Sequence, residues 1–312
     1  MSNAPSSARD TAIAIGIAIA EYFRDMGYNV TLLTDSTTRW LRSLTLHHAD
    51  TFEVKATSKL ESFFERAGKL ICVGSPHRYG SISIFGTVSC DGSNYADSVC
   101  TIALQCVQSA WFLDVKLAQR RHFPSINPLI SFSKNSQNLD TFYQDIDSEF
   151  PRLRDQIKNI IRTADDLSEI VALIGPASAL DTQPYLFLQG SQLEEHDKLC
   201  YQYAKFIHND FLAQNFSESD SFCPFYKTIW MMKNFVLYYD LSLEAIQEEQ
   251  MTWAYVLSKT VDLLYRLTLM KFEVEILLIE MLNGQDPEQG EKVVVANLKS
   301  FHDEIQNRFQ SL

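Results

Sequence analysis

The sequence lacks basic clusters, and this absence bounds the partners of the protein. The 312 residues carry 39 acidic and 27 basic side chains, which gives a net charge of −12. The densest basic spot is the short stretch Gln119–His122. Because nucleic-acid binding depends on Lys and Arg neutralising phosphates, we expect no nucleic-acid partner.

Cysteine pairs with metal-binding spacing are also absent. The six cysteines, at positions 72, 90, 100, 106, 200 and 223, form no C-x-x-C pair and have no His-rich neighbourhood. We therefore expect no zinc site. The pattern suggests a reducing compartment, in which cysteines serve as small buried hydrophobic side chains.

Long hydrophobic runs are missing as well. The longest candidate, Thr11–Ala20, has ten residues and is too short to span a bilayer. No basic region precedes it, as one would in a signal peptide. This segment therefore predicts a helix that is buried against a sheet. The overall composition is that of an ordinary globular protein, and we expect a cytoplasmic one.

Glycine is unevenly distributed and divides the chain. Seven of the eleven glycines precede residue 93, and none lies between Gly92 and Gly175. Glycines at strand ends are typical of an α/β sheet, whereas long glycine-free stretches are typical of helices. The sequence predicts an α/β fold with a mostly parallel sheet in residues 1–138, followed by a C-terminal α-helical bundle in residues 139–312.

Local patterns predict the individual elements. In the first part we expect helices at 8–26 and 57–67 and strands at 28–34, 69–73 and 81–88, while 102–111 can be a buried strand or the start of a helix. In the second part we expect helices at 165–175, 194–213, 227–249, 251–271 and 291–310. The aromatic and Met residues from Trp230 to Tyr239 are expected in the bundle core.

One acid at the end of a predicted strand is the strongest candidate site residue. The apolar strand Tyr28–Thr34 ends at Asp35, which is followed by Ser36-Thr37. P-loop NTPases hold magnesium and nucleotide with an acid in this position, the Walker-B acid. The alternative is that Asp35 or its hydroxyl neighbours cap the next helix.

The phosphate-binding loop that such an acid needs does not occur in these 312 residues. The chain's Gly-Lys pair, Gly68-Lys69, has Phe63 where the first glycine of the loop belongs and Leu70 where the hydroxyl residue belongs.

Two proline-linked aromatics are further candidates. Phe123 precedes Pro124, and Phe222 lies two residues before Pro224. Exposed aromatic rings can stack on an adenine, although packing in a core or interface is the commoner role. Arg39 and Arg66 can contact phosphate or pair with a local carboxylate, and His47-His48 is interpreted as a solvated loop.

Several segments together resemble a known family. They are 26–30, 34–40, 62–68, 117–124, 222–228 and 270–272. In this order they are similar to the C-terminal half of the catalytic A subunit of the vacuolar-type proton-pumping ATPase. The resemblance implies a partial P-loop NTPase (RecA-like) domain that lacks its P-loop, followed by the helical domain.

The resemblance also implies a role for the candidate residues. Asp35 corresponds to the Walker-B acid that contacts the magnesium of Mg-ATP, and Phe123 and Phe222 correspond to parts of the adenine pocket. The implied partners, in a hetero-oligomeric ring, are the stalk and rotor subunits together with the B subunit. That ring lies on the cytosolic face of vacuolar and endolysosomal membranes, so the membrane is reached only through the complex.

The chain departs from the family pattern in several places. The family's P-loop and the Gly-Glu-Arg motif with its catalytic glutamate are absent, Leu41–Glu61 replaces a longer segment, and Ser89–Gly92 replaces a double-proline, double-glycine loop. Extra residues occur around 183–193 and 274–282. We therefore expect a truncated or degenerate form that has no catalytic residue of its own and does not hydrolyse ATP alone. The alternative is a non-catalytic assembly module that docks on B-type or stalk subunits.

Overall fold

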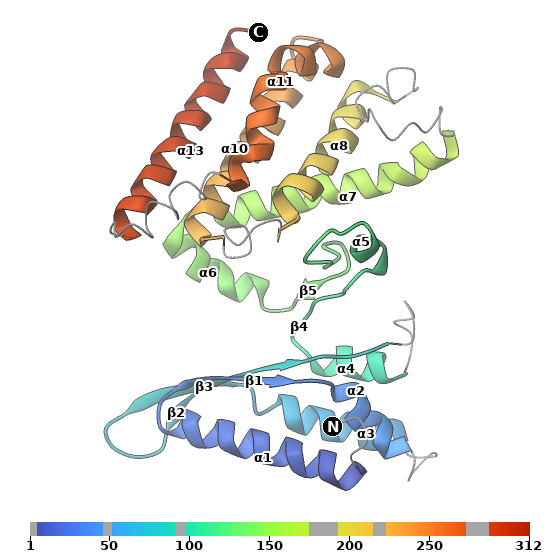
Figure 1. Cartoon of the computed structure of the whole chain (residues 1–312), viewed down its shortest axis with the longest axis vertical. Coiled ribbons are helices and arrows are strands. Elements are labelled where there is room, and N and C mark those ends of the chain that lie inside the picture. The colour runs from blue at the N-terminus through green and yellow to red at the C-terminus, as the bar shows by residue number, and fades with distance from the viewer. Residues whose placement is uncertain (1–4, 46–51, 91–97, 175–192, 215–222, 273–286) are drawn as a thin grey trace. The chain divides into compact units, whose positions relative to one another are not determined.

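The structure is a computed structural model that describes residues 5–45, 52–90, 98–174, 193–214, 223–272 and 287–312. Its residues fall into two compact units, Met1–Ala110 and Trp111–Leu312 (Figure 1). Each unit is described separately below.

The first unit combines helices with a three-stranded sheet. Its elements are α1 (Ser6–Asp25), β1 (Asn29–Thr34), α2 (Thr37–Thr45), α3 (Phe52–Phe64), β2 (Gly68–Cys72), β3 (Arg78–Gly86), α4 (Ser98–Cys106) and the two-residue β4 (Ser109–Ala110). The strand order is β1-β3-β2. The predicted α/β class is confirmed, and within this sheet β1 runs parallel to β3 whereas β2 runs antiparallel to it.

Helix α1 packs on β1 and β3, as the apolar pattern predicts (Figure 1). Ile17 and Ala20 are buried, but Ile15 and Ile19 on the same helix are more than half exposed. The helix is therefore buried along one side. It ends before Gly27, which adopts a φ of +97° that is accessible to glycine at little cost and reverses the chain into β1.

The segment 102–111 resolves in favour of helix. Residues up to Cys106 belong to α4, and the strand β4 has only Ser109 and Ala110. Val99, Ile102 and Ala103 of α4 join a core cluster with Trp40 and Leu41 of α2. Burial of this apolar face against α2 and α3 explains why a continuous apolar run forms a helix here.

The second unit is mostly helical. Its elements are α5 (Val115–Gln119), β5 (Phe132–Ser133), α6 (Ser136–Ile146), α7 (Phe150–Ile174), α8 (Glu195–Phe206), the π-helix η2 (Ile207–Leu212), α10 (Phe225–Gln247), α11 (Trp253–Leu269), the 3-10 helix η3 (Met270–Phe272) and α13 (Pro287–Gln310). All five predicted helices are present, and α7 begins fifteen residues earlier than 165, at Phe150.

A single large core holds these helices together. Helix α10 contributes Met231, Phe235 and Tyr238, which are buried as predicted. The ring of Tyr238 stacks on that of Tyr203 from α8, with centroids 5.7 Å apart and planes 8° from parallel. The Tyr203 hydroxyl donates a 2.7 Å hydrogen bond to the Phe235 carbonyl, so this buried polar atom is satisfied.

Candidate functional site

Asp35 directly follows the last residue of β1 and is exposed. The parallel pairing of β1 with β3 brings the carboxyl ends of both strands to the same edge, which is where open α/β sheets bind ligands. Thr87, the residue after β3, donates from Oγ1 to Asp35 Oδ1 at 2.9 Å, and its N–H donates to the Thr34 carbonyl at 3.0 Å. The sheet thus places an oriented carboxylate at its edge.

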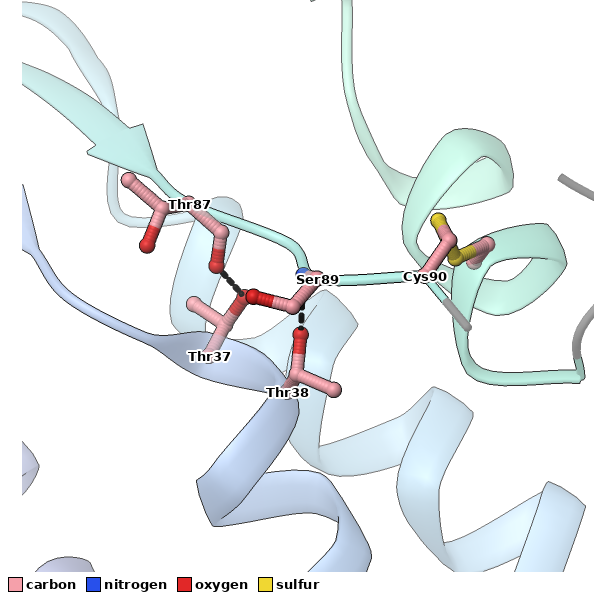
Figure 2. The surroundings of a disulfide bond; sticks show 6 residues. Thr37, Thr38, Thr87, Ser89 and Cys90 are labelled. Atoms are coloured by element: carbon pink, nitrogen blue, oxygen red, sulfur yellow. Dashed lines mark hydrogen bonds between the residues drawn. A yellow bond between two sulfur atoms is a disulfide. The ribbon is translucent and has the colours of Figure 1, made fainter. Parts of the chain in front are cut away.

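The first two residues of α2 hold the segment that follows β3, residues 87–89. Thr37 and Thr38 are buried, and both the N–H and the hydroxyl of Thr37 donate to the Thr87 carbonyl, at 3.0 and 2.8 Å. The Ser89 N–H donates to Thr38 Oγ1 at 2.7 Å (Figure 2). The Thr37 hydroxyl, which was one of the candidate helix caps, therefore holds the segment after β3 together with Thr38, and Asp35 bonds to Thr87.

A carboxylate with a neighbouring hydroxyl has the oxygen chemistry that Mg²⁺ prefers. Within the described residues there is no group of three or more His, Cys, Asp or Glu side chains that would hold a metal by themselves. Mg²⁺ in nucleotide sites is bound by one or two carboxylates together with the phosphates. The oxygen groups present here fit a magnesium ion that would be held mainly by phosphates, and Asp35 is the carboxylate that could hold it.

Phe123 lies in the second unit, after α5. Helix α5 begins at an N-cap, Asp114, whose side chain accepts from the Lys116 N–H at 2.7 Å. The Phe123 side chain is 41% exposed, and its carbonyl accepts from the Gln214 N–H at 2.6 Å. The ring is thus available on a backbone that is held in place. Phe222 lies outside the described residues, and Asp35 and Phe123 belong to different units.

A cluster of titratable groups next to Phe123 escaped the sequence analysis. His122 is buried, and its ring centroid lies 6.1 Å from that of His208 in η2. Burial, followed by the charge of Lys271, lowers the pKa of His122, and burial followed by His122 lowers the pKa of His208. Burial raises the pKa of Asp210 to about 6, against the opposing charge of Lys271.

Two buried lysines complete this region. Lys227 is fully buried and donates from Nζ to the Lys271 carbonyl, while Lys271 donates from Nζ to the Asn209 carbonyl at 3.1 Å. They lie in the segments 222–228 and 270–272, which carry part of the family resemblance. No role was predicted for these two side chains. Lysine is rarely buried completely unless it is paired, and no local pattern announces such a position.

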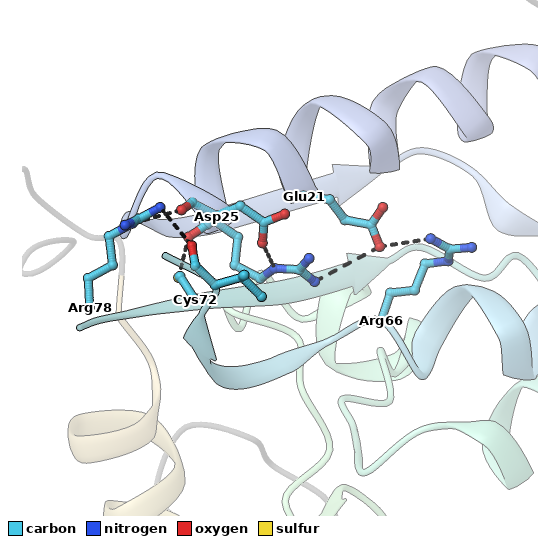
Figure 3. Close-up of polar contacts among 7 residues, drawn as sticks. Glu21, Asp25, Arg66, Cys72 and Arg78 are labelled. Atoms are coloured by element: carbon cyan, nitrogen blue, oxygen red, sulfur yellow. Dashed lines mark hydrogen bonds and ion pairs between the residues drawn. The ribbon is translucent and has the colours of Figure 1, made fainter. Parts of the chain in front are cut away.

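Arg66 was expected either to contact phosphate or to pair with a local carboxylate, and the structure shows a carboxylate partner. Arg66 Nη1 lies 2.7 Å from Glu21 Oε1 (Figure 3). Arg24, which lies nearby on α1, pairs with Asp25. The interpretation as a local ion pair is confirmed. Arg39 is exposed and its carbonyl accepts from Arg9 at 3.2 Å. His47 and His48 lie outside the described residues.

The expectation that the cysteines act as small hydrophobic side chains is wrong for two of them. Cys90 and Cys100 form a disulfide, with Cα atoms 6.3 Å apart (Figure 2). Their pairing depends on the tertiary contact between the segment after β3 and α4, which sequence spacing does not reveal. Cys72 and Cys200 are free and buried, in line with the expectation.

Comparisons with known protein families agree with this geometry. Residues 1–133 match the ATP synthase alpha/beta family, nucleotide-binding domain, and residues 139–256 match the C-terminal domain of V and A type ATP synthase. The first part of the chain is therefore similar to the nucleotide-binding domain of the ATP synthase alpha/beta family, and the second part to the C-terminal domain of V and A type ATP synthases.

The relatives narrow the class further. The chain is 40% identical to the catalytic A subunit of the V-type proton ATPase of Arabidopsis thaliana over 326 aligned positions, which cover 100% of the chain and 48% of the relative. It is 41% identical to the corresponding protein of Dictyostelium discoideum, covering 99% of the chain and 48% of the relative. The predicted similarity to this family is confirmed. The chain spans about half the length of these curated relatives.

Solved structures support the fold. A prototypical ATPase from the type III secretion system of pathogenic bacteria shares 28% identity at a TM-score of 0.53, covering 75% of this chain and 62% of that one. The type III secretion ATPase EscN of enteropathogenic E. coli shares 28% sequence identity at a TM-score of 0.56, covering 75% of this chain and 52% of that one.

Among the described residues, no helix combines the length and apolar character needed to cross a bilayer.

Proposed function

We propose that this chain is a component of a proton-translocating ATPase, related to the catalytic A subunit, and that Asp35 contributes the magnesium-binding carboxylate of its nucleotide site. The observation that carries the proposal is the Asp35–Thr87 pair at the carboxyl ends of two parallel strands. Similarity to catalytic A subunits over the full chain supports it. Phe123 and Phe222 are proposed to contribute to the adenine pocket.

Asp35 would act on the nucleotide by electrostatics. With Asp35 helping to hold it, a magnesium ion bound with ATP would supply positive charge that stabilises the phosphates. The chain's own contribution is to hold a carboxylate at a fixed place, through Thr87 and through the hydrogen bonds of Thr37 to the same residue. Because the carboxylate is already held in place, it need not reorganise when a metal binds.

These 312 residues alone are proposed not to turn over ATP. They contain neither the Gly-x-x-x-x-Gly-Lys-Ser/Thr loop, whose amides and lysine cradle the phosphates, nor the family's Gly-Glu-Arg motif that carries the catalytic glutamate. We propose that B-type and stalk subunits are the partners with which the chain assembles, on the cytosolic face of endomembranes. The division into domains 1–138 and 139–312 remains part of this proposal.

The test combines turnover with ligand stabilisation. We expect no phosphate release by the purified chain above a buffer control, and a melting temperature that rises with Mg-ATP in the native chain but not in Asp35→Ala. Turnover that is lost in Asp35→Ala would overturn the proposed inactivity. If Mg-ATP stabilises neither protein while the chain still co-purifies with a B subunit, the nucleotide role is wrong and the chain is a non-catalytic assembly module.

A further inference from the structure

The disulfide between Cys90 and Cys100 joins two elements of the first unit. Cys100 is the third residue of α4 and is buried, with 2% of its surface exposed, whereas Cys90 follows the segment after β3 and is half-buried. The other cysteines among the described residues, Cys72, Cys106, Cys200 and Cys223, form no disulfide. The bond therefore joins a half-buried residue to a buried one.

The Cys100 side of the bond is firmly embedded. Its neighbours Val99, Ile102 and Ala103 belong to the core cluster that includes Trp40 and Leu41 of α2. Close packing of this kind leaves little freedom for α4 to move on its own. Opening the bond would therefore free the Cys90 side.

The Cys90 side leads directly to Asp35. Three residues before Cys90, Thr87 donates to the Asp35 carboxylate. One residue before Cys90, the Ser89 N–H donates to Thr38 Oγ1 (Figure 2). The disulfide thus closes the far end of the short segment that orients the candidate magnesium ligand.

We propose that Cys90–Cys100 is a reversible thiol–disulfide site at which a dithiol reductant releases the 87–90 segment beside Asp35. One thiolate of the reductant attacks Cys90 Sγ, the bond between the two protein sulfurs breaks, and Cys100 leaves as a thiolate that takes up a proton. The second thiol of the reductant then attacks the mixed disulfide and releases Cys90 as a thiol. Two electrons and two protons pass to the protein, and the reductant becomes a disulfide.

Opening the bond has two consequences. The covalent loop across a sequence separation of 10 no longer restricts the unfolded chain, so the first unit becomes less stable. The 87–90 segment keeps only its hydrogen bonds, so the amides of Thr87 and Ser89 open more often. This redox response is independent of whether the chain binds a nucleotide.

The first experiment maps the thiols of the full chain. After equilibration with oxidised glutathione, alkylation and peptide mass spectrometry should find Cys90 joined to Cys100, and dithiothreitol should open the bond. Removal of the dithiothreitol should restore it. Quantitative alkylation of both cysteines under oxidising conditions, or failure of the bond to re-form, would overturn the proposal.

The second experiment measures the effect on the site. Dithiothreitol should lower the melting temperature of the first unit by on the order of 10 °C and raise the exchange rate of the Thr87 and Ser89 amides several-fold. The double variant Cys90→Ser/Cys100→Ser should show neither response, while Cys223→Ser should respond as the native chain does. Unchanged amide exchange in the native chain on reduction would refute the link to Asp35.

Discussion

Thr87 Oγ1 donates a 2.9 Å hydrogen bond to Asp35 Oδ1 although 52 residues separate them in the chain. The contact exists because β1 and β3 are adjacent and parallel and end at the same edge. It converts an isolated strand-end acid into an oriented carboxylate. A carboxylate whose direction is fixed binds a metal with less loss of side-chain entropy than a free one.

Removing the Thr87 hydroxyl should weaken the effect of Mg-ATP on stability. In Thr87→Val the carboxylate loses a hydrogen bond worth about 1 kcal/mol, so the Mg-ATP concentration at half-maximal stabilisation should rise about fivefold. Titrations followed by thermal melting measure this concentration. Thr87→Ser should behave like the native chain; an equal shift in both variants would contradict a role for the hydroxyl.

Gly80 should not tolerate a side chain. A Cβ at this position would lie 2.1 Å from the Arg24 carbonyl oxygen, where α1 crosses β3. Because the obstacle is backbone, Gly80→Ala should lower the free energy of unfolding by about 2–3 kcal/mol, as measured by urea denaturation.

The matched control for this change is Gly16, a glycine of α1. At Gly16 the nearest atom to a new Cβ is Leu32 Cδ1, at an ordinary contact distance of 3.8 Å. Gly16→Ala should raise the free energy of unfolding by about 0.5–1 kcal/mol, because alanine favours the helical backbone. Comparable losses in both variants would show that the crossing at Gly80 is not the cause.

Lys227 should be a strong contributor to the stability of the helical unit. Its fully buried ammonium donates to the Lys271 carbonyl, so truncation leaves a buried acceptor without this donor and opens a cavity. Lys227→Ala should cost about 3 kcal/mol of unfolding free energy, and Lys227→Met, which keeps most of the volume, should cost less. The exposed Lys299 on α13 is the control, since Lys299→Met should change stability by less than about 0.5 kcal/mol.

Asp210 should make the helical unit less stable as the pH rises. Burial raises the pKa of its carboxyl from 3.8 in the unfolded chain to about 6, so the folded state prefers the protonated acid. Its favourable contribution is fully present below pH 3.8 and is lost as the pH rises through about 6.

Asp210→Asn should therefore have a higher free energy of unfolding than the native chain at pH 7–8, by on the order of 2 kcal/mol, and so melt at a higher temperature; the difference should vanish near pH 4. Thermal melts across this pH range measure the difference. Asp166→Asn, which removes an exposed carboxyl group of α7, is the matched control variant. A native-minus-variant difference that stays constant with pH would rule out titration of Asp210.

His122 and His208, which lie near Asp210, change the stability with pH in the opposite direction. They do so in the native chain and in Asp210→Asn alike. Burial lowers the pKa values of His122 and His208, so their contribution is present above pH 6.5 and is lost as the pH falls further. The comparison of native chain and variant removes this shared background.

Local patterns predicted most of the elements because they depend on residues close in sequence. Apolar periodicity and helix-stop signals located α1, α10 and α11, and Gly27 marks the end of α1 as expected. The same local signals placed Asp35 directly after a strand. The segment 102–111 stayed ambiguous because a short apolar run fits a buried helix and a buried strand equally well.

By itself, the sequence determined the α/β class, the helical second half, the similarity to V-type catalytic A subunits, and the position of Asp35 at a strand end. Only the tertiary structure decided which residues surround that acid. The Asp35–Thr87 hydrogen bond, the disulfide of Cys90 with Cys100 and the burial of Lys227 all join residues brought together by the packing of distant elements. Such contacts leave no local periodicity in the chain, so the strand that ends at Asp35 was visible in the sequence while the partners that orient its carboxylate were not.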